Sequence, residues 1–212
     1  MTPRLRHLAP GLAMLASLGT ASAYESGPPD AMCGNPPGQS NCTMCHYEFE
    51  VNSGGGSLAL LGLPADYVPG QTYALTVQLE DQGQDRWGFE LTVLDDADPT
   101  HEGGQLAVTD PDNTQISYDY FGTEDYLKQT KTGTQADIVD GPVTWTFDWT
   151  APDATVSSVT FYVAGNAADG DVSYTGDYIY LKKMTLFAAP PTPVDGSSWG
   201  KVKALYRGAL PR

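Results

Sequence analysis

Two cysteines and a histidine stand close together near the start of the chain, in the order Cys42, Thr43, Met44, Cys45, His46. Two thiols separated by two residues and followed directly by histidine form the pattern that attaches c-type haem. The cysteines would form thioethers with the vinyl groups of the porphyrin, and the histidine would bind the iron. The pattern therefore predicts one covalently bound haem c, held by Cys42 and Cys45, with His46 as the proximal iron ligand.

The same residues admit two other interpretations, because a CxxC pair also occurs in zinc sites and in redox-active thiol pairs. Together with Cys33, the pattern offers three cysteines and one histidine, a legal ligand set for tetrahedral zinc. A disulfide from Cys33 to Cys42 or to Cys45 would leave one thiol over. We favour haem, since the spacing from Cys33 to Cys42 is not that of a usual zinc knuckle.

The second iron ligand is harder to assign from the sequence. Beyond residue 23, the only histidine besides His46 is His101, which stands in an acidic segment. Met32 is the next candidate, because Met44 lies between the two thioether cysteines and cannot reach the opposite face of the haem. We therefore name His101 or Met32 as the candidate distal ligand, and we keep an iron with no second protein ligand as an alternative.

Residues 1–23 have the composition of an export signal, with a basic start, an apolar middle and the ending Ala21-Ser22-Ala23. The apolar stretch is too short to span a bilayer, and no later segment is long and apolar enough. Export also agrees with the haem pattern, because bacteria attach c-type haem after export. We expect an extracellular or cell-surface protein without a membrane span, with the periplasm as the alternative compartment.

The chain is acidic, with 26 acidic and 11 basic residues and a formal net charge of −15. This excess argues against nucleic-acid binding, which needs clustered lysine and arginine. The acidity favours solubility outside the cell, or the steering of a cationic partner. Because the motifs of nucleophile elbows, zinc proteases and phosphate loops are all missing, the sequence predicts no catalytic residue.

Beyond residue 57, short runs of β-branched and aromatic residues recur between turn signals, a pattern typical of an all-β sandwich. Within residues 143–149, Val143, Trp145, Phe147 and Trp149 alternate with polar residues, so one face of this strand should lie in the core. No window inside the domain predicts an amphipathic helix. We expect strands at residues 58–61, 72–79, 87–94, 105–108, 114–118, 143–149, 156–164 and 178–187.

Two segments flank this single predicted domain, residues 58–188. Residues 24–57 are rich in glycine, proline, serine and asparagine, so we expect an irregular haem-attachment segment that is ordered only if the rest of the molecule holds it. Residues 189–212 begin as a proline-rich linker and end in a short basic tail. We interpret the tail as a frayed terminus or as a segment for attachment to the cell envelope.

Oxygen-bearing side chains collect between residues 166 and 177, among them Asp169, Asp171 and Asp177. Calcium prefers such ligands, but the segment lacks the ordered spacing and the final glutamate of an EF-hand. We therefore interpret it as a polar loop between two strands.

Several segments also carry a shared pattern, namely residues 27–29, 41–46, 63–73, 86–91, 160–167 and 176–180. Together they resemble the bacterial reelin-domain-like family called choice-of-anchor V, over about residues 27–186. The resemblance implies a reeler-type, immunoglobulin-like β-sandwich, export, and display at the cell surface by varied C-terminal anchors. Members of that family commonly carry the same CxxCH near their start, in agreement with Cys42, Cys45 and His46.

This chain differs from the family pattern at one position that could concern the second iron ligand. In relatives a histidine often stands in the stretch that corresponds to residues 126–130, where this chain has Gln129. If that histidine is the distal ligand in the family, its loss puts six-coordination in doubt here.

Residues and resemblance together predict an exported, cell-surface monohaem protein like a c-type cytochrome, acting in electron transfer or in haem-based redox binding. A single haem needs another redox centre within tunnelling reach, which implies docking to a redox or surface protein. The alternative is a surface adhesion or matrix β-sandwich without haem, in which the cysteines form a structural disulfide.

Overall fold

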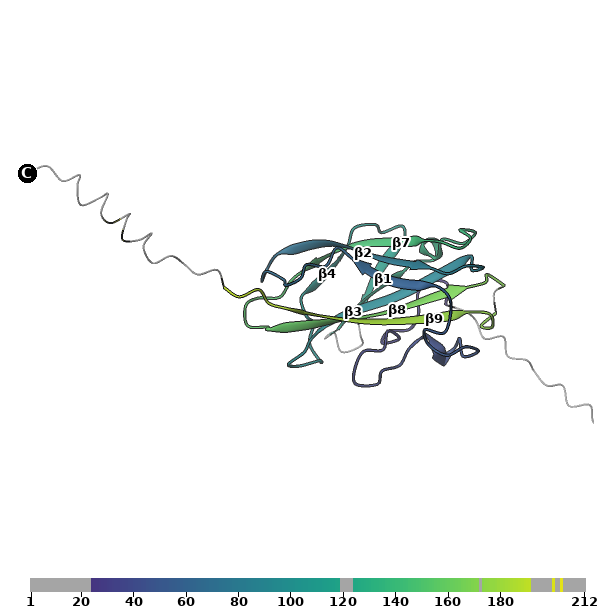
Figure 1. Cartoon of the computed structure of the whole chain (residues 1–212), viewed down its shortest axis with the longest axis horizontal. Coiled ribbons are helices and arrows are strands. Elements are labelled where there is room, and N and C mark those ends of the chain that lie inside the picture. The colour runs from purple at the N-terminus through teal and green to yellow at the C-terminus, as the bar shows by residue number, and fades with distance from the viewer. Residues whose placement is uncertain (1–23, 119–123, 172, 192–199, 201–202, 204–212) are drawn as a thin grey trace, which may run out of the picture.

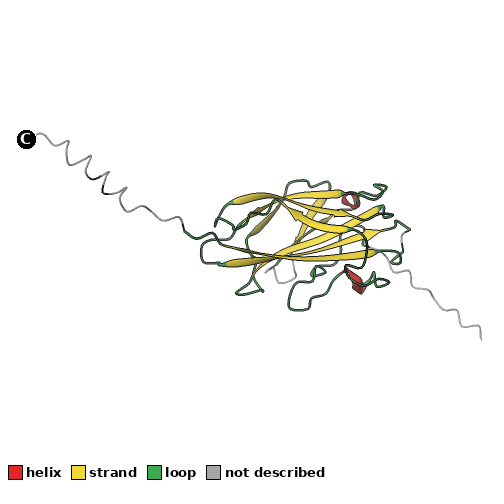
Figure 2. Cartoon of the chain, in the orientation of Figure 1, coloured by secondary structure: helices red, strands yellow, loops and turns green. Residues whose placement is uncertain are grey.

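The computed structural model describes residues 24–118, 124–171, 173–191, 200 and 203. Its strands form two antiparallel sheets that pack face to face (Figure 1), and the helical content of the body is limited to two short turns (Figure 2). One sheet has the strand order β1-β2-β7-β4, and the other has the order β5-β6-β3-β8-β9. The strands are β1 (Ser57–Leu61), β2 (Thr72–Glu80), β3 (Arg86–Asp95), β4 (Gln105–Val108), β5 (Thr114–Tyr118), β6 (Asp125–Gln129), β7 (Val143–Thr150), β8 (Ser158–Ala168) and β9 (Tyr178–Phe187), and the 3-10 turns are η1 (Cys42–Met44) and η2 (Thr132–Thr134).

The predicted all-β sandwich is confirmed, and each of the eight expected strands is present with ends shifted by a few residues. Strand β6 is not predictable from the sequence pattern, because its residues DYLKQ show no run of β-branched side chains. This strand forms because it pairs with β5 and β3, opposing Leu127 to Ile116 and to Leu91. Tertiary packing thus overrides a weak local preference.

The core lies between the two sheets and is closed by aromatic side chains. The alternation expected in β7 is observed, with Val143, Trp145, Phe147 and Trp149 all buried. A buried indole N–H needs a partner, and those of Trp145 and Trp149 donate to the carbonyls of Gly133 and Gly103 at 2.8 and 3.0 Å.

The outer face of the five-stranded sheet is also covered. In antiparallel sheets, the face that does not pack on the core is commonly exposed to solvent. Eight consecutive residues of β3 are buried, including Glu90 and Thr92, which alternate with the core-facing Leu91 and Val93. The N-terminal segment, residues 24–56, provides the cover and lies along this sheet on the side away from the other sheet (Figure 1). The segment expected to be irregular is therefore held by the domain.

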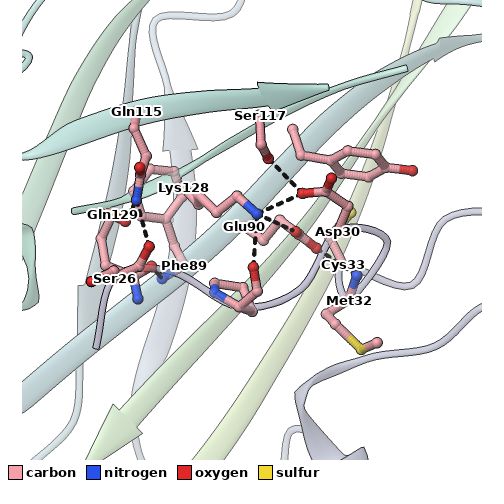
Figure 3. Close-up of polar contacts among 12 residues, drawn as sticks. Ser26, Asp30, Met32, Cys33, Phe89, Glu90, Gln115, Ser117, Lys128 and Gln129 are labelled. Atoms are coloured by element: carbon pink, nitrogen blue, oxygen red, sulfur yellow. Dashed lines mark hydrogen bonds and ion pairs between the residues drawn. The ribbon is translucent and has the colours of Figure 1, made fainter. Parts of the chain in front are cut away.

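A buried charge cluster fixes this segment to the sheet (Figure 3). The ammonium group of Lys128 donates to the carbonyl of Pro28 at 2.7 Å and pairs with Asp30 at 2.6 Å. Ser117 donates to the same Asp30 carboxylate. Glu90 lies 3.8 Å from the Lys128 ammonium, and its burial raises the pKa of this carboxyl to about 8.

The predicted export signal, residues 1–23, and most of the tail beyond residue 191 lie outside the described residues. In the part of the chain that the structure describes, no helix is long and apolar enough to cross a membrane.

Candidate functional site

The CxxCH pattern forms one compact turn on the covered face of the sheet. Asn41 caps η1 by accepting hydrogen bonds from the backbone N–H and the hydroxyl of Thr43, at 2.9 and 2.7 Å. The backbone N–H groups of Cys45 and His46 both donate to the carbonyl of Cys42. This turn places the two thiols and the imidazole of the pattern beside one another.

The imidazole of His46 is held from behind by Asp177, the residue just before β9. Nδ1 lies 2.5 Å from Oδ2 of Asp177, whose side chain is only 1% exposed. Because a carboxylate only accepts, the proton of this contact lies on Nδ1, which makes Nε2 the lone-pair nitrogen of the neutral imidazole. Nε2 faces the amide Nδ2 of Asn166 at 3.4 Å. A histidine that binds a metal through one nitrogen and donates to a carboxylate with the other shows this same arrangement.

A cavity of about 430 Å³ opens beside this turn. Ligand sites in proteins have volumes of roughly 300 to 1,000 Å³ and mostly apolar walls. The lining is largely apolar, and it includes both thiols of the pattern. The residues that form it are Tyr24, Pro28, Pro29, Met32, Asn41, Cys42, Met44, Cys45, His46, Gly88, Phe89, Gln129, Asn166 and Tyr174.

A second, more polar cavity of about 720 Å³ adjoins the first. Both are lined by Tyr24, His46, Gly88, Gln129 and Asn166, so the imidazole lies where they meet. The second cavity adds charged side chains, among them Arg86, Asp169 and Asp177.

The structure brings together four of the five iron-site candidates named from the sequence. Cys42, Cys45, His46 and Met32 all line the smaller cavity. It does not bring His101 there, since this side chain is 66% exposed and pairs with Asp98 at 3.0 Å. His101 is anchored to Asp95 at the far end of β3, which lies roughly 23 Å from Gly88 at the usual rise of a strand.

The zinc and calcium interpretations are not supported by the arrangement. Within the described residues, no three histidine, cysteine or acidic side chains are grouped to hold a metal ion. Cys33 is buried, with its sulfur 3.4 Å from the amide oxygen of Asn35. All three cysteines are free thiols. Burial, together with the charge of nearby Glu90, raises the pKa of Cys42 to about 12.

Sequence reasoning missed three residues of this site. Asp177 and Asn166 had been assigned to a polar loop, whereas Asn166 belongs to β8 and Asp177 holds the imidazole. Gln129 was known only as a departure from the family pattern, and the structure places it in both cavities. No local spacing signals these contacts, because 120 to 131 positions separate the first two residues from His46.

No family model matches the chain, and no curated protein matches it. Among solved structures it is similar to the human F-spondin reeler domain (fragment 1), with 18% identity and a TM-score of 0.45 over 66% of this chain and 93% of that chain. The major pilin SpaD from Corynebacterium diphtheriae gives 10% identity and a TM-score of 0.43 over 62% of this chain and 35% of the pilin. A type II cohesin domain from the cellulosome of Acetivibrio cellulolyticus gives 7% and 0.37 over 62% of this chain and 94% of the cohesin. These likenesses concern the fold, and we transfer no function from them.

Proposed function

We propose that this chain is an exported, cell-surface protein that carries one covalent haem in the smaller cavity and acts in electron transfer or haem-based redox binding. The observation that carries the proposal is the state of His46. With the proton of the Asp177 contact on Nδ1, Nε2 is the lone-pair nitrogen of the neutral imidazole, and it faces the Asn166 amide near two free thiols.

The residues present fit haem c in their chemistry. Cys42 and Cys45 would form the thioether bonds, and His46 would bind the iron through Nε2. Apolar side chains such as Met32 and Phe89 line the remaining wall and would exclude water from the porphyrin. When bound, the haem supplies a one-electron couple whose potential depends on axial ligands, hydrogen bonds and solvent exposure.

A redox partner is part of the proposal, because one haem cannot pass electrons onward alone. The formal net charge of −15 favours a cationic surface on that partner. Association of this kind is weakened by salt, since oppositely charged surfaces attract over about one Debye length.

The second candidate is a surface adhesion or matrix module without haem. It is favoured by the completeness of the sandwich core, which closes between the two sheets without the cavity residues Cys42, Cys45 and His46.

A pyridine haemochrome spectrum separates the two candidates. The protein is exported from a host with the c-type maturation machinery, as wild type, as the Cys42→Ala/Cys45→Ala double variant, and as Cys33→Ala, the matched control. We expect a c-type spectrum in wild type and in Cys33→Ala, and none in the double variant. A colourless wild-type protein from this host would refute the proposal and leave the second candidate.

A further inference from the structure

The amide nitrogen Nε2 of Gln129 is a hydrogen-bond donor on the wall of the two cavities that His46 also lines. This side chain, at the end of β6, is 5% exposed. Its Oε1 accepts a hydrogen bond of 2.9 Å from the backbone N–H of Phe89 (Figure 3). Because a backbone N–H only donates, this bond fixes which end of the amide is oxygen. The amino group, Nε2, must therefore face the other way.

Gly88 keeps the space around this amino group open. A Cβ built on Gly88 would lie 3.1 Å from Nε2 of Gln129, closer than ordinary van der Waals contact. Within the described part of the chain, no acceptor is hydrogen-bonded to Nε2, and Gln129 lines both cavities together with His46. The amino group is therefore available to donate to water or to a ligand in these cavities.

If haem occupied the smaller cavity, His46 would hold its iron on one side, and a second protein ligand would have to come from the other lining side chains. Besides His46 and the two cysteines, the side chains lining the smaller cavity that are of a type known to bind haem iron are Met32, Met44, Tyr24 and Tyr174. An amide that presents N–H, not a lone pair, is a poor ligand for iron but a good partner for a ligand that carries an acceptor atom. The adjoining polar cavity leaves room for such a ligand to enter.

We infer that this site binds a small ligand with a hydrogen-bond acceptor, such as a small inorganic anion, at an open iron position, and that Gln129 donates to it. The inference rests on the proposed haem. It assigns Gln129 the part of a binding residue, and it makes the protein a receptor for small ligands as well as an electron carrier.

The test uses the holoprotein with its covalent haem and two probes. Carbon monoxide, added to the reduced protein, reports whether the iron position is open. Fluoride, added to the oxidised protein, reports the hydrogen-bond donor. Both titrations are followed by the shift of the Soret band. We expect wild-type protein to bind both probes.

Gln129→Glu is the most informative variant, because it keeps the acceptor for the Phe89 N–H and replaces only the amino group by oxygen. We expect fluoride affinity to fall about tenfold or more, which is the cost of losing one charge-assisted hydrogen bond, while carbon monoxide affinity stays within about twofold. Gln129→Leu should weaken fluoride binding similarly without adding a charge. Gln78→Glu, a glutamine of the other sheet, is the matched control and should change neither affinity.

Three outcomes would overturn the inference. A holoprotein that binds neither probe has its iron closed by a protein ligand, with Met32 the first suspect, and the haem proposal then stands without the small ligand. Unchanged fluoride affinity in both Gln129 variants would remove Gln129 as the donor. A wild-type protein without haem would overturn both this inference and the proposed function.

Discussion

The imidazole of His46 and the carboxylate of Asp177 come from positions 131 residues apart and meet with 2.5 Å between Nδ1 and Oδ2. Both groups are held in place by the backbone around them. His46 belongs to the turn that begins at Cys42, and the second carboxylate oxygen of Asp177 accepts from the N–H of Asp169 at 3.3 Å. A carboxylate in this position makes the imidazole a stronger electron donor through Nε2.

Replacing Asp177 by asparagine should raise the reduction potential of the haem. The stronger donor stabilises oxidised iron, and its loss removes that preference. If outer-shell changes of this kind cost tenfold in relative affinity, the rise is about 60 mV for a one-electron couple. Spectroelectrochemical titration measures it. Asp169→Asn, a neighbouring carboxylate that does not contact His46, is the control, and equal potentials in the two variants would contradict the role of Asp177.

Replacing His101 by alanine should leave the haem spectrum of the exported protein unchanged. Its side chain is solvent-exposed and lies at the end of β3 opposite to Gly88. His46→Ala, in contrast, should abolish the wild-type spectrum. Absorption spectra of the oxidised and reduced protein decide the matter, and a shift in His101→Ala would mean that the loop reaches the iron.

Met32→Leu tests the other sequence-based candidate for the distal ligand. Leucine conserves the size of the side chain but cannot bind iron. Because we infer an open iron position, we expect the spectrum to stay the same, with carbon monoxide binding as in wild type. A spectrum that changes from six-coordinate to five-coordinate would instead identify Met32 as the distal ligand.

The stability of the wild-type protein should fall as the pH rises from about 4.5 to about 8, because of Glu90. Burial raises the pKa of this carboxyl from 4.5 to about 8, although the nearby Lys128 opposes the rise and Asp30 adds to it. In this window the folded state holds a proton that the unfolded state has lost, so unfolding becomes easier with increasing pH. The contribution of protonated Glu90 to the free energy of unfolding is therefore complete only below the pKa of Glu90 in the unfolded state.

Glu90→Gln removes this titration while keeping the shape of the side chain. The difference in unfolding free energy between variant and wild type should shift in favour of the variant by a few kcal/mol between pH 4.5 and pH 8. Urea unfolding at both pH values measures the shift. Parallel changes in the two proteins would show that Glu90 does not titrate in this range.

Replacing Lys128 by methionine should loosen the N-terminal segment from the sheet. The side chain of Lys128 is 7% exposed, and its ammonium group bonds both to the carbonyl of Pro28 and to Asp30. Its removal leaves the carbonyl of Pro28 and the partly exposed Asp30 carboxylate without their charged partner, so the segment loses two contacts with the sheet. We expect faster amide hydrogen exchange in residues 24–56, whereas Lys183→Met, an exposed lysine of β9, should leave exchange as in wild type. Equal exchange in both variants would argue against the anchoring role.

Local patterns were sufficient to predict most of the sandwich. The alternation of Trp145, Phe147 and Trp149 with polar residues identified a core strand, because side chains of a strand alternate between its faces. The same rule failed for β6. Its polar residues Lys128 and Gln129 suggest exposure to solvent, but both are buried in the structure. A strand that is covered on both faces of its sheet need not show alternating apolar and polar residues.

The site was predictable only where its residues are neighbours in the chain. Cys42, Cys45 and His46 form a contiguous pattern, so their chemistry could be recognised from spacing alone. Asp177 precedes β9 and Gln129 ends β6, and the pairing of these strands with their neighbours brings both residues to the same cavity. Contacts of this range follow from the topology of the sheet, which no short pattern encodes.

A covalent haem on this chain is tested most directly by the mass of the exported wild-type protein and of its peptide that contains residues 42–46. We predict that both carry the added mass of one haem, and that the adduct survives denaturation because two thioether bonds hold it. A bare polypeptide mass from a host that matures other c-type cytochromes would contradict the account and leave a β-sandwich whose CxxCH turn has another purpose.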